Sequence, residues 1–217
     1  MTAKSGEQQV IGEQGARRLE QCVAEGGVAV FPTDTVYGVC CDPDNEQAAQ
    51  RLYALKGRPA ARPAAVMFFS LEPALEMLPE LAPDERAALA ALLPGPVTLL
   101  LSNPSLRFGP ACRTDPVTLG LRVPRLPERL GALASLVRPV MQSSANRSGE
   151  PDARTLAEVP RSMLDGADLV LDGGELPGTP STVIDLRDYS AQRRWHVLRE
   201  GALARSTVRE TLTSLGC

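Results

Sequence analysis

The stretch Val28-Ala-Val-Phe-Pro-Thr-Asp-Thr-Val-Tyr-Gly-Val39 indicates the fold class of this chain. Its apolar run, residues 28–31, has the length and composition of a buried β-strand, and Pro32 ends it. The small polar side chains of Thr33, Asp34 and Thr35 follow directly. Polar side chains at the end of a buried strand are typical of the ligand-binding edge of an α/β sheet, so we expect a ligand site here.

Three cations come about twenty residues later, at the end of a predicted helix. Residues 46–56 have the apolar spacing of a helix, and Lys56, Arg58 and Arg62 lie at and just beyond its end. Three cations this close together can surround one polyanion. The alternative is a solvated helix end whose charges complement the helix dipole. The chain has one other lysine, Lys4, so Lys56 does not belong to a lysine-rich surface.

The rest of the chain alternates between predicted helices and short buried strands. We expect further helices at 10–25, 83–93, 126–137 and 205–215. We expect strands at 64–69, 97–101, 118–124, 139–142, 169–171, 181–186 and 195–198, with a loop at 101–116. A chain of 217 residues with 43% hydrophobic content can bury one core of its own, so the pattern indicates a single α/β domain over residues 1–217.

Composition excludes several classes of protein. The net charge of −3 is unlike the basic footprint of a nucleic-acid-binding protein. Five cysteines without a C-x-x-C motif argue against a disulfide framework and a zinc site, and one histidine, His196, excludes a multi-histidine metal site. The uncharged stretch 87–106 is interrupted by Pro94-Gly95-Pro96, so it does not predict a membrane helix. With no apolar signal core at the start of the chain, we expect a cytoplasmic protein.

The polar residues expected at the strand ends are hydroxyls, amides and cations, with hardly a general base among them. They are Thr35, Tyr37, Lys56, Arg58, Arg62, Arg122, Ser143, Ser144, Asn146, Ser181 and Arg199. Such a set binds anions and holds them in line, as phosphoryl and nucleotidyl transfer require. Neither a P-loop nor a G-x-G-x-x-G motif is present, so a nucleotide would be held by another fold.

Each of these groups also has a purely structural interpretation. Thr33 and Thr35 could form a turn after Pro32. Arg122 could pair with a surface carboxylate, and the stretch Ser143-Ser-Ala-Asn146 could cap a helix. Their joint occurrence in one chain favours the functional interpretation.

Taken together, the segments resemble the YrdC/Sua5 family of L-threonylcarbamoyladenylate synthases, in its short single-domain form. The resemblance covers about residues 15–205. The matching stretches, in order, are Phe31-Pro-Thr-Asp-Thr-Val-Tyr-Gly38, Leu55-Lys-Gly-Arg-Pro59, Leu93-Pro-Gly-Pro-Val-Thr98, Leu121-Arg-Val-Pro124, Ser143-Ser-Ala-Asn146, Asp172-Gly-Gly174, Ser181-Thr-Val-Ile-Asp185 and Leu198-Arg-Glu-Gly201.

The resemblance implies a twisted mixed α/β sheet with a large concave ligand cavity on one face. It also implies a nucleotidyltransferase that converts L-threonine, bicarbonate or carbon dioxide, and ATP into threonylcarbamoyl-AMP and diphosphate. Magnesium would accompany ATP, and no residue is expected as a dedicated metal ligand. A separate transferase would then use the product to modify the adenosine next to the anticodon in tRNA.

The resemblance also implies roles for individual residues. Those expected to bind threonine are Thr35, Arg122 and Ser181. Those expected around ATP are Lys56, Arg58, Arg62, Thr118, Ser144, Asn146 and Arg199, of which Lys56 and Arg58 are expected to be catalytic. The chain departs from the family pattern at Arg62-Pro63-Ala64, Met67 and Leu126.

Two other functions stay open at the level of sequence. One is a non-catalytic module that binds tRNA or ribosomal RNA through a cationic concave surface. The other is a carbamoyltransferase with a different acceptor.

Overall fold

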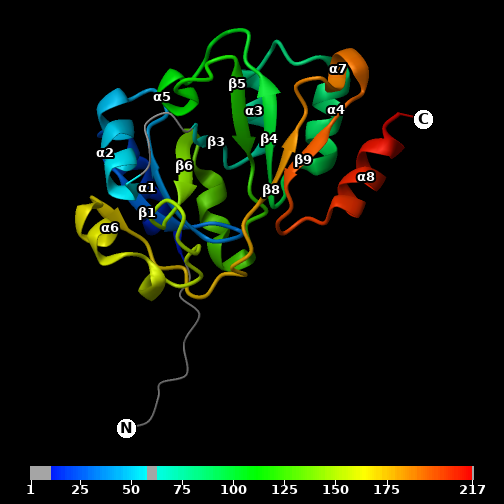
Figure 1. Ribbon diagram of the computed structural model, residues 1–217. Helices are drawn as coiled ribbons and strands as arrows, with labels where there is room; N and C mark the ends of the chain where they lie inside the picture. Colours follow the sequence, from blue (N-terminus) through cyan, green and yellow to red (C-terminus); the bar gives the residue numbers. More distant parts are fainter. Residues whose placement is uncertain (1–10, 58–62, 217) are drawn as a thin grey trace.

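A mixed β-sheet forms the centre of the molecule (Figure 1). The computed structural model describes residues 11–57 and 63–216. Within these residues, nine strands pair in the order β7-β1-β2-β6-β3-β5-β4-β8-β9. Their bounds are β1 Ala29–Pro32, β2 Tyr37–Cys41, β3 Ala65–Met67, β4 Val97–Ser102, β5 Thr118–Arg122, β6 Val140–Ser144, β7 Leu169–Val170, β8 Thr182–Asp185 and β9 His196–Arg199. The predicted fold class, a mixed α/β domain with a twisted sheet, is confirmed.

Helices pack at both ends of this sheet (Figure 1). Their bounds are α1 Glu13–Ala24, α2 Glu46–Lys56, α3 Leu71–Met77, α4 Pro83–Leu92, α5 Gly109–Cys112, α6 Arg161–Gly166, α7 Tyr189–Gln192 and α8 Arg205–Ser214, with 3-10 helices η1 Glu128–Ser135 and η2 Leu156–Glu158. Near β1 and β2, α2 contacts β2, α5 and α6. At the other end, α4 contacts α7 and α8. No helix within residues 11–57 and 63–216 is long and apolar enough to cross a membrane.

Local sequence signals account for the helix that carries Lys56. The side chain of Asn45 accepts a hydrogen bond from the Ala48 amide at 3.0 Å, which caps the first turn of α2. Gly57 adopts the left-handed conformation, with φ of 55°, directly after Lys56. Glycine adopts this conformation without steric cost, so α2 ends where the sequence predicts.

Strand β2 was not predicted. It pairs antiparallel with β1, with Pro32 opposite Tyr37, so the polar residues after Pro32 form the loop of a β-hairpin. Gly38 lies inside β2, and glycine has a low intrinsic propensity for β-strands. Its missing side chain leaves room for Gln142, because a Cβ atom at Gly38 would lie 2.9 Å from the Gln142 amide nitrogen. Packing between strands therefore outweighs the local preference.

Several other expectations need correction. The predicted loop 101–116 contains the short helix α5, and the predicted helix 126–137 is the 3-10 helix η1. Helices α3, α6 and α7 were not predicted; each has seven residues or fewer. Such short elements give too few turns for an apolar period to be recognised.

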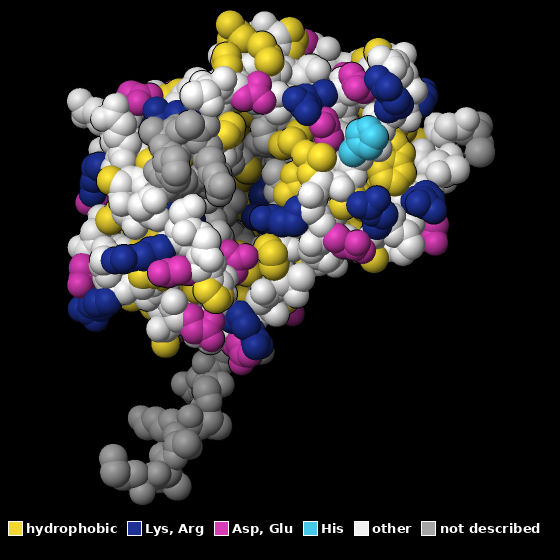
Figure 2. Space-filling model, in the orientation of Figure 1, with side chains coloured by type: hydrophobic (Ala, Val, Ile, Leu, Met, Phe, Trp, Pro, Cys, Tyr) yellow, Lys and Arg dark blue, Asp and Glu magenta, His cyan; other side chains and the backbone are white. Residues whose placement is uncertain are grey.

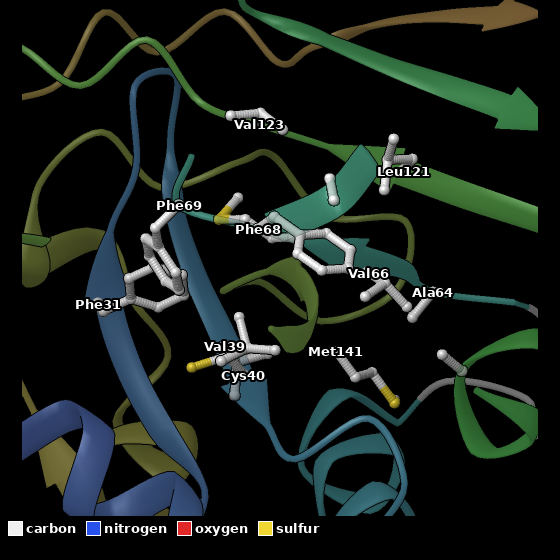
Figure 3. Packing of buried hydrophobic residues seen from close by; sticks show 14 of the residues in the cluster. Phe31, Val39, Cys40, Ala64, Val66, Phe68, Phe69, Leu121, Val123 and Met141 are labelled. Carbon is white, nitrogen blue, oxygen red and sulfur yellow. The ribbon is translucent and has the colours of Figure 1, made fainter. Parts of the chain in front are cut away.

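The core is built from aromatic and aliphatic side chains of the sheet and the segments beside it (Figure 3). The rings of Phe31 and Phe69 lie 6.4 Å apart, and those of Phe68 and Phe108 lie 6.3 Å apart, at distances typical of favourable aromatic pairs. Met67, one of the departures from the family pattern, is fully buried.

The cysteines described by the structure are free thiols, as expected for a protein without a disulfide framework. Burial raises the pKa of Cys112 to about 11 and that of Cys41 to about 12, and it raises the pKa of Cys40 as well. The thiolate is the reactive form, so the raised pKa makes these thiols poorly reactive near neutral pH.

We therefore expect these three buried thiols to resist alkylation at pH 8 in the folded protein and to react fully in denaturant. Iodoacetamide labelling followed by peptide mass spectrometry measures this at each site. The Cys217→Ser variant removes the C-terminal thiol from the reaction. Equal labelling rates in folded and denatured protein would contradict the burial of these side chains.

Candidate active site

A cavity of about 370 Å³ lies over one face of the sheet. Figure 2 shows a hollow at the centre of this face, with arginine or lysine side chains at its wall. The cavity is lined by residues from β3, β4, β5, β6, β8 and β9 and from the segments next to them. Residue types that bind ligands are concentrated in this lining: Thr98, Asp115, Thr118, Arg122, Gln142, Ser143, Ser144, Asp152, Ser181 and Arg199.

The alternation of side chains along a strand determines which residues reach the cavity. In β5, Thr118, Gly120 and Arg122 line the cavity, while Leu119 and Leu121 are buried in the core. Successive side chains of a strand point to opposite faces, so one strand supplies both the core and the site. The predicted strand-end residues Arg122, Ser144 and Arg199 line this cavity, and residues in the middle of strands, such as Gly120 and Gln142, line it as well.

The guanidinium group of Arg122 is almost completely buried, with 4% of its side chain exposed. Nη2 donates to Asp34 Oδ1 at 2.8 Å and to Thr35 Oγ1 at 3.2 Å. Nη1 donates to Gln142 Oε1 at 3.2 Å. The hairpin loop and β6 thus fix this side chain from two directions.

One donor of this guanidinium is left without an acceptor. Arg122 Nε is buried and has no hydrogen-bond partner. A buried donor without a partner costs about 1–3 kcal/mol, more when the group is charged. Burial lowers the pKa of Arg122, and the ion pair with Asp34 opposes that shift. Arg122 lines the cavity, so an anionic ligand there would lie beside a buried positive charge.

A second group of buried polar side chains lies around Ser181. Its hydroxyl group is 2.9 Å from the hydroxyl of Thr98. Arg199 donates from Nη2 to the Ser181 carbonyl at 2.7 Å and to the Ser181 hydroxyl at 3.3 Å. Arg199 and Arg122 are close enough for the charge of one to lower the pKa of the other. Two neighbouring cations in one cavity indicate a site for an anion.

Lys56 is buried behind the stretch that follows β6. Its Nζ donates to the backbone carbonyl of Ser144, to the Asn146 carbonyl at 2.9 Å and to Asn146 Oδ1 at 3.1 Å. The Ser144 hydroxyl donates to the same Asn146 oxygen at 2.6 Å. The end of α2 therefore fixes the conformation of residues 144–146.

At another part of the cavity, Thr118 accepts a hydrogen bond from Arg187 Nη1 at 3.2 Å. Arg187 also forms a bidentate ion pair with Asp185. Because arginine only donates, the hydroxyl proton of Thr118 is available to an acceptor on a ligand.

A family model named Sua5, YciO and YrdC, described as telomere recombination, matches residues 21–201. This chain belongs to the Sua5/YciO/YrdC family. Among curated relatives, the threonylcarbamoyl-AMP synthase of Chromohalobacter salexigens is 35% identical over 187 residues, which are 84% of this chain and 100% of the relative.

A second relative is longer than this chain. The threonylcarbamoyl-AMP synthase of Pyrococcus abyssi is 35% identical over 170 residues, which are 77% of this chain and 49% of the relative. The chain thus matches about half the length of that protein.

Two solved structures share the fold. The P. abyssi Sua5 structure with L-threonine matches with a TM-score of 0.80 and 32% sequence identity. The matched region is 93% of this chain and 58% of the P. abyssi chain. The Escherichia coli YciO structure matches with a TM-score of 0.74 and 24% sequence identity, over 89% of this chain and 92% of the YciO chain. At this identity the match shows a shared fold and nothing about function.

The site of this Sua5/YciO/YrdC protein brings most of the predicted residues together. Arg122, Ser181, Thr118, Ser144 and Arg199 line the cavity. Three further predicted residues are linked to these by hydrogen bonds: Thr35 accepts from Arg122, Asn146 accepts from Ser144, and Lys56 donates to Asn146. Arg58 and Arg62 lie outside the described residues. The assigned roles of all these residues remain predictions.

The sequence analysis missed four polar residues that line the cavity, and it named Asp34 only as part of the polar cluster after Pro32. Thr98, Asp115, Gln142 and Asp152 line the cavity, and Asp34 lies behind it in contact with Arg122. The period of two along β5 and β6 could have found Gln142, which lies two residues before Ser144 on the same face. No local pattern predicts the pairing of Asp34 with Arg122, because the two residues lie 88 positions apart in the sequence.

Proposed function

We infer that this chain is a threonylcarbamoyl-AMP synthase, a nucleotidyltransferase that acts on L-threonine, bicarbonate or carbon dioxide, and ATP. The observation that carries this inference is the match to a synthase along that relative's whole length, combined with a cavity lined by two arginines, Arg122 and Arg199. The L-threonine named with the P. abyssi structure supports the amino-acid substrate.

The reaction suits a site of hydroxyls, amides and cations. The amine of threonine captures carbon dioxide, and an oxygen of the resulting carbamate forms a bond to the α-phosphorus of ATP. The bond from the α-phosphorus to the bridging oxygen breaks, and diphosphate leaves with the electron pair. The carbamate is itself the nucleophile, so this chain's residues need only position the reactants and stabilise the charge of the transition state.

In this proposal the two substrates bind in adjacent parts of the cavity. Arg122, Thr35 and Ser181 would bind threonine, with the carboxylate on the buried guanidinium group. The residues that would surround the nucleotide are Lys56, Arg58, Arg62, Thr118, Ser144, Asn146 and Arg199. Arg199 touches Ser181, so the two regions meet where the carbamate and the α-phosphate would react.

Magnesium would bind with ATP and neutralise part of the triphosphate charge. No cluster of three or more acidic, histidine or cysteine side chains occurs in the described part of the chain. Asp115 and Asp152 line the cavity and would hold the ion, since magnesium is commonly bound by one or two carboxylates together with substrate phosphates.

The product, threonylcarbamoyl-AMP, is a mixed anhydride and would serve a separate transferase that modifies the adenosine next to the anticodon in tRNA. A cytoplasmic location is part of this proposal, because ATP and unmodified tRNA are both found there.

Diphosphate release from ATP and bicarbonate, with and without L-threonine, tests the proposed function. We expect release that depends on threonine, together with a new adenylate in the mass spectrum. Binding of ATP without threonine-dependent release would favour a carbamoyltransferase with another acceptor. Absence of ATP binding, together with RNA binding that weakens steeply as salt rises, would favour the RNA-binding module.

A further inference from the structure

Asp34 is a buried carboxylate of the site that does not line the cavity. It lies in the hairpin loop between β1 and β2, and 3% of its side chain is exposed. Oδ1 accepts from Arg122 Nη2 at 2.8 Å, and Oδ2 accepts from the backbone nitrogen of Arg125 at 3.0 Å. Both oxygens are therefore engaged by the protein, so the carboxylate acts on the site through its neighbours.

Asp34 acts on the site mainly by orienting the side chain of Arg122. The other two acceptors of Arg122, the Thr35 hydroxyl and the Gln142 side-chain carbonyl, are neutral and lie at 3.2 Å. A hydrogen bond between two charged groups is shorter and roughly twice as strong as a neutral one, so Asp34 dominates the orientation of the guanidinium. The bond from Asp34 to Arg125 also holds the chain just after β5, the strand on which Arg122 lies.

Asp34 also balances charge in the cavity. Arg122 and Arg199 are neighbouring cations that repel each other, and Asp34 is the carboxylate paired with Arg122. The pair leaves Arg122 Nε as a buried donor without a partner. The ion pair through Nη2 thus holds the guanidinium group in the wall of the cavity, which Arg122 lines.

We propose that Asp34 is a positioning residue for the amino-acid substrate: it fixes the guanidinium group of Arg122 in the wall of the cavity, where that group would meet the α-carboxylate of the substrate. This inference rests on the proposed function, in which Arg122 binds threonine. Asp34 itself contacts no substrate atom.

The Asp34→Asn variant tests the proposal. Asparagine has the same shape and can still accept from Arg122, but its NH₂ group then faces the Arg125 N–H, so two donors meet. We expect the KM for L-threonine to rise at least tenfold, while the KM for ATP stays within twofold. If Asp34 only stabilised the fold, this substitution would not raise the KM for threonine selectively over the KM for ATP.

Asp168→Asn is the matched control. Asp168 also pairs with an arginine, Arg51, at 2.9 Å, and it is not among the residues that line the cavity. We expect its kinetic constants to equal those of the wild type. If the wild type shows no threonine-dependent turnover, the proposed function is wrong. If the wild type turns over normally and the Asp34→Asn variant has an unchanged KM for threonine, only the role of Asp34 is wrong.

Two further variants keep the test decisive if Asp34→Asn does not fold. Asp34→Glu keeps the charge but displaces the carboxylate by one methylene group, and it should also raise the threonine KM selectively. In an Arg122→Lys background, the Asp34→Glu change should have less than a twofold effect on that KM, because the planar group that Asp34 orients is missing. Independent, multiplicative effects of the two changes would contradict a role exerted through Arg122.

Discussion

The Arg122→Ala variant is expected to lower kcat/KM for L-threonine by about 100-fold, because one charge-assisted hydrogen bond contributes roughly 1.5–3 kcal/mol. Steady-state measurement of diphosphate release at varied threonine concentration gives this value. A change of less than threefold would contradict the placement of the threonine carboxylate on Arg122.

The same variant is also expected to lower the free energy of unfolding by about 3–5 kcal/mol. It leaves Asp34 buried without its cation, and an uncompensated buried charge is strongly destabilising. Burial already raises the pKa of Asp34, and the charge of Arg122 limits that rise. Without Arg122 the pKa should rise further, so protonation of Asp34 would moderate part of the loss. Urea unfolding at pH 7 measures the difference.

A double variant separates binding from stability. Changing Asp34 to Asn together with Arg122→Ala removes both charges, so it should regain part of the lost stability. Turnover of threonine should stay low, since the donor for its carboxylate is still missing. Recovery of threonine turnover in this double variant would show that Arg122 acts on the fold rather than on the substrate.

The second large effect is expected for Lys56→Met. Methionine fills a similar volume, but it leaves the carbonyl of Ser144 and two oxygens of Asn146 without the ammonium that binds them. We expect the free energy of unfolding to fall by about 1–3 kcal/mol and kcat/KM for ATP to fall about 10- to 150-fold. Urea unfolding and turnover at varied ATP concentration measure the two quantities.

Arg51→Met is a matched control on the same helix. Arg51 forms a half-exposed ion pair with Asp168, and an ion pair of this kind contributes about 0–1 kcal/mol. Its kinetic constants should equal those of the wild type. If Lys56→Met behaved like this control, neither a role in fixing residues 144–146 nor a role at the nucleotide could be maintained.

The comparison of sequence and structure separates two kinds of information. Helices α1, α2 and α4 and the predicted strands are found close to their expected bounds. Their signals are local: an apolar period, a capping residue such as Asn45, or a glycine such as Gly57 that ends a helix. The hydroxyl, amide and cationic character of the site was likewise evident in the sequence, because most of its polar residues lie at or near the ends of strands and of one helix that can be recognised locally.

The sequence by itself therefore determined the class of fold, the chemical character of the site and, through its motifs, the resemblance to a family. Only the tertiary structure decided that mid-strand residues such as Gln142 line the cavity, that β2 forms a hairpin with β1, and that Asp34 pairs with Arg122. The physical reason is the range of the interactions involved. Helix caps and apolar periods act between residues a few positions apart, whereas strand pairing and buried ion pairs join distant segments whose contact depends on the packing of the whole sheet.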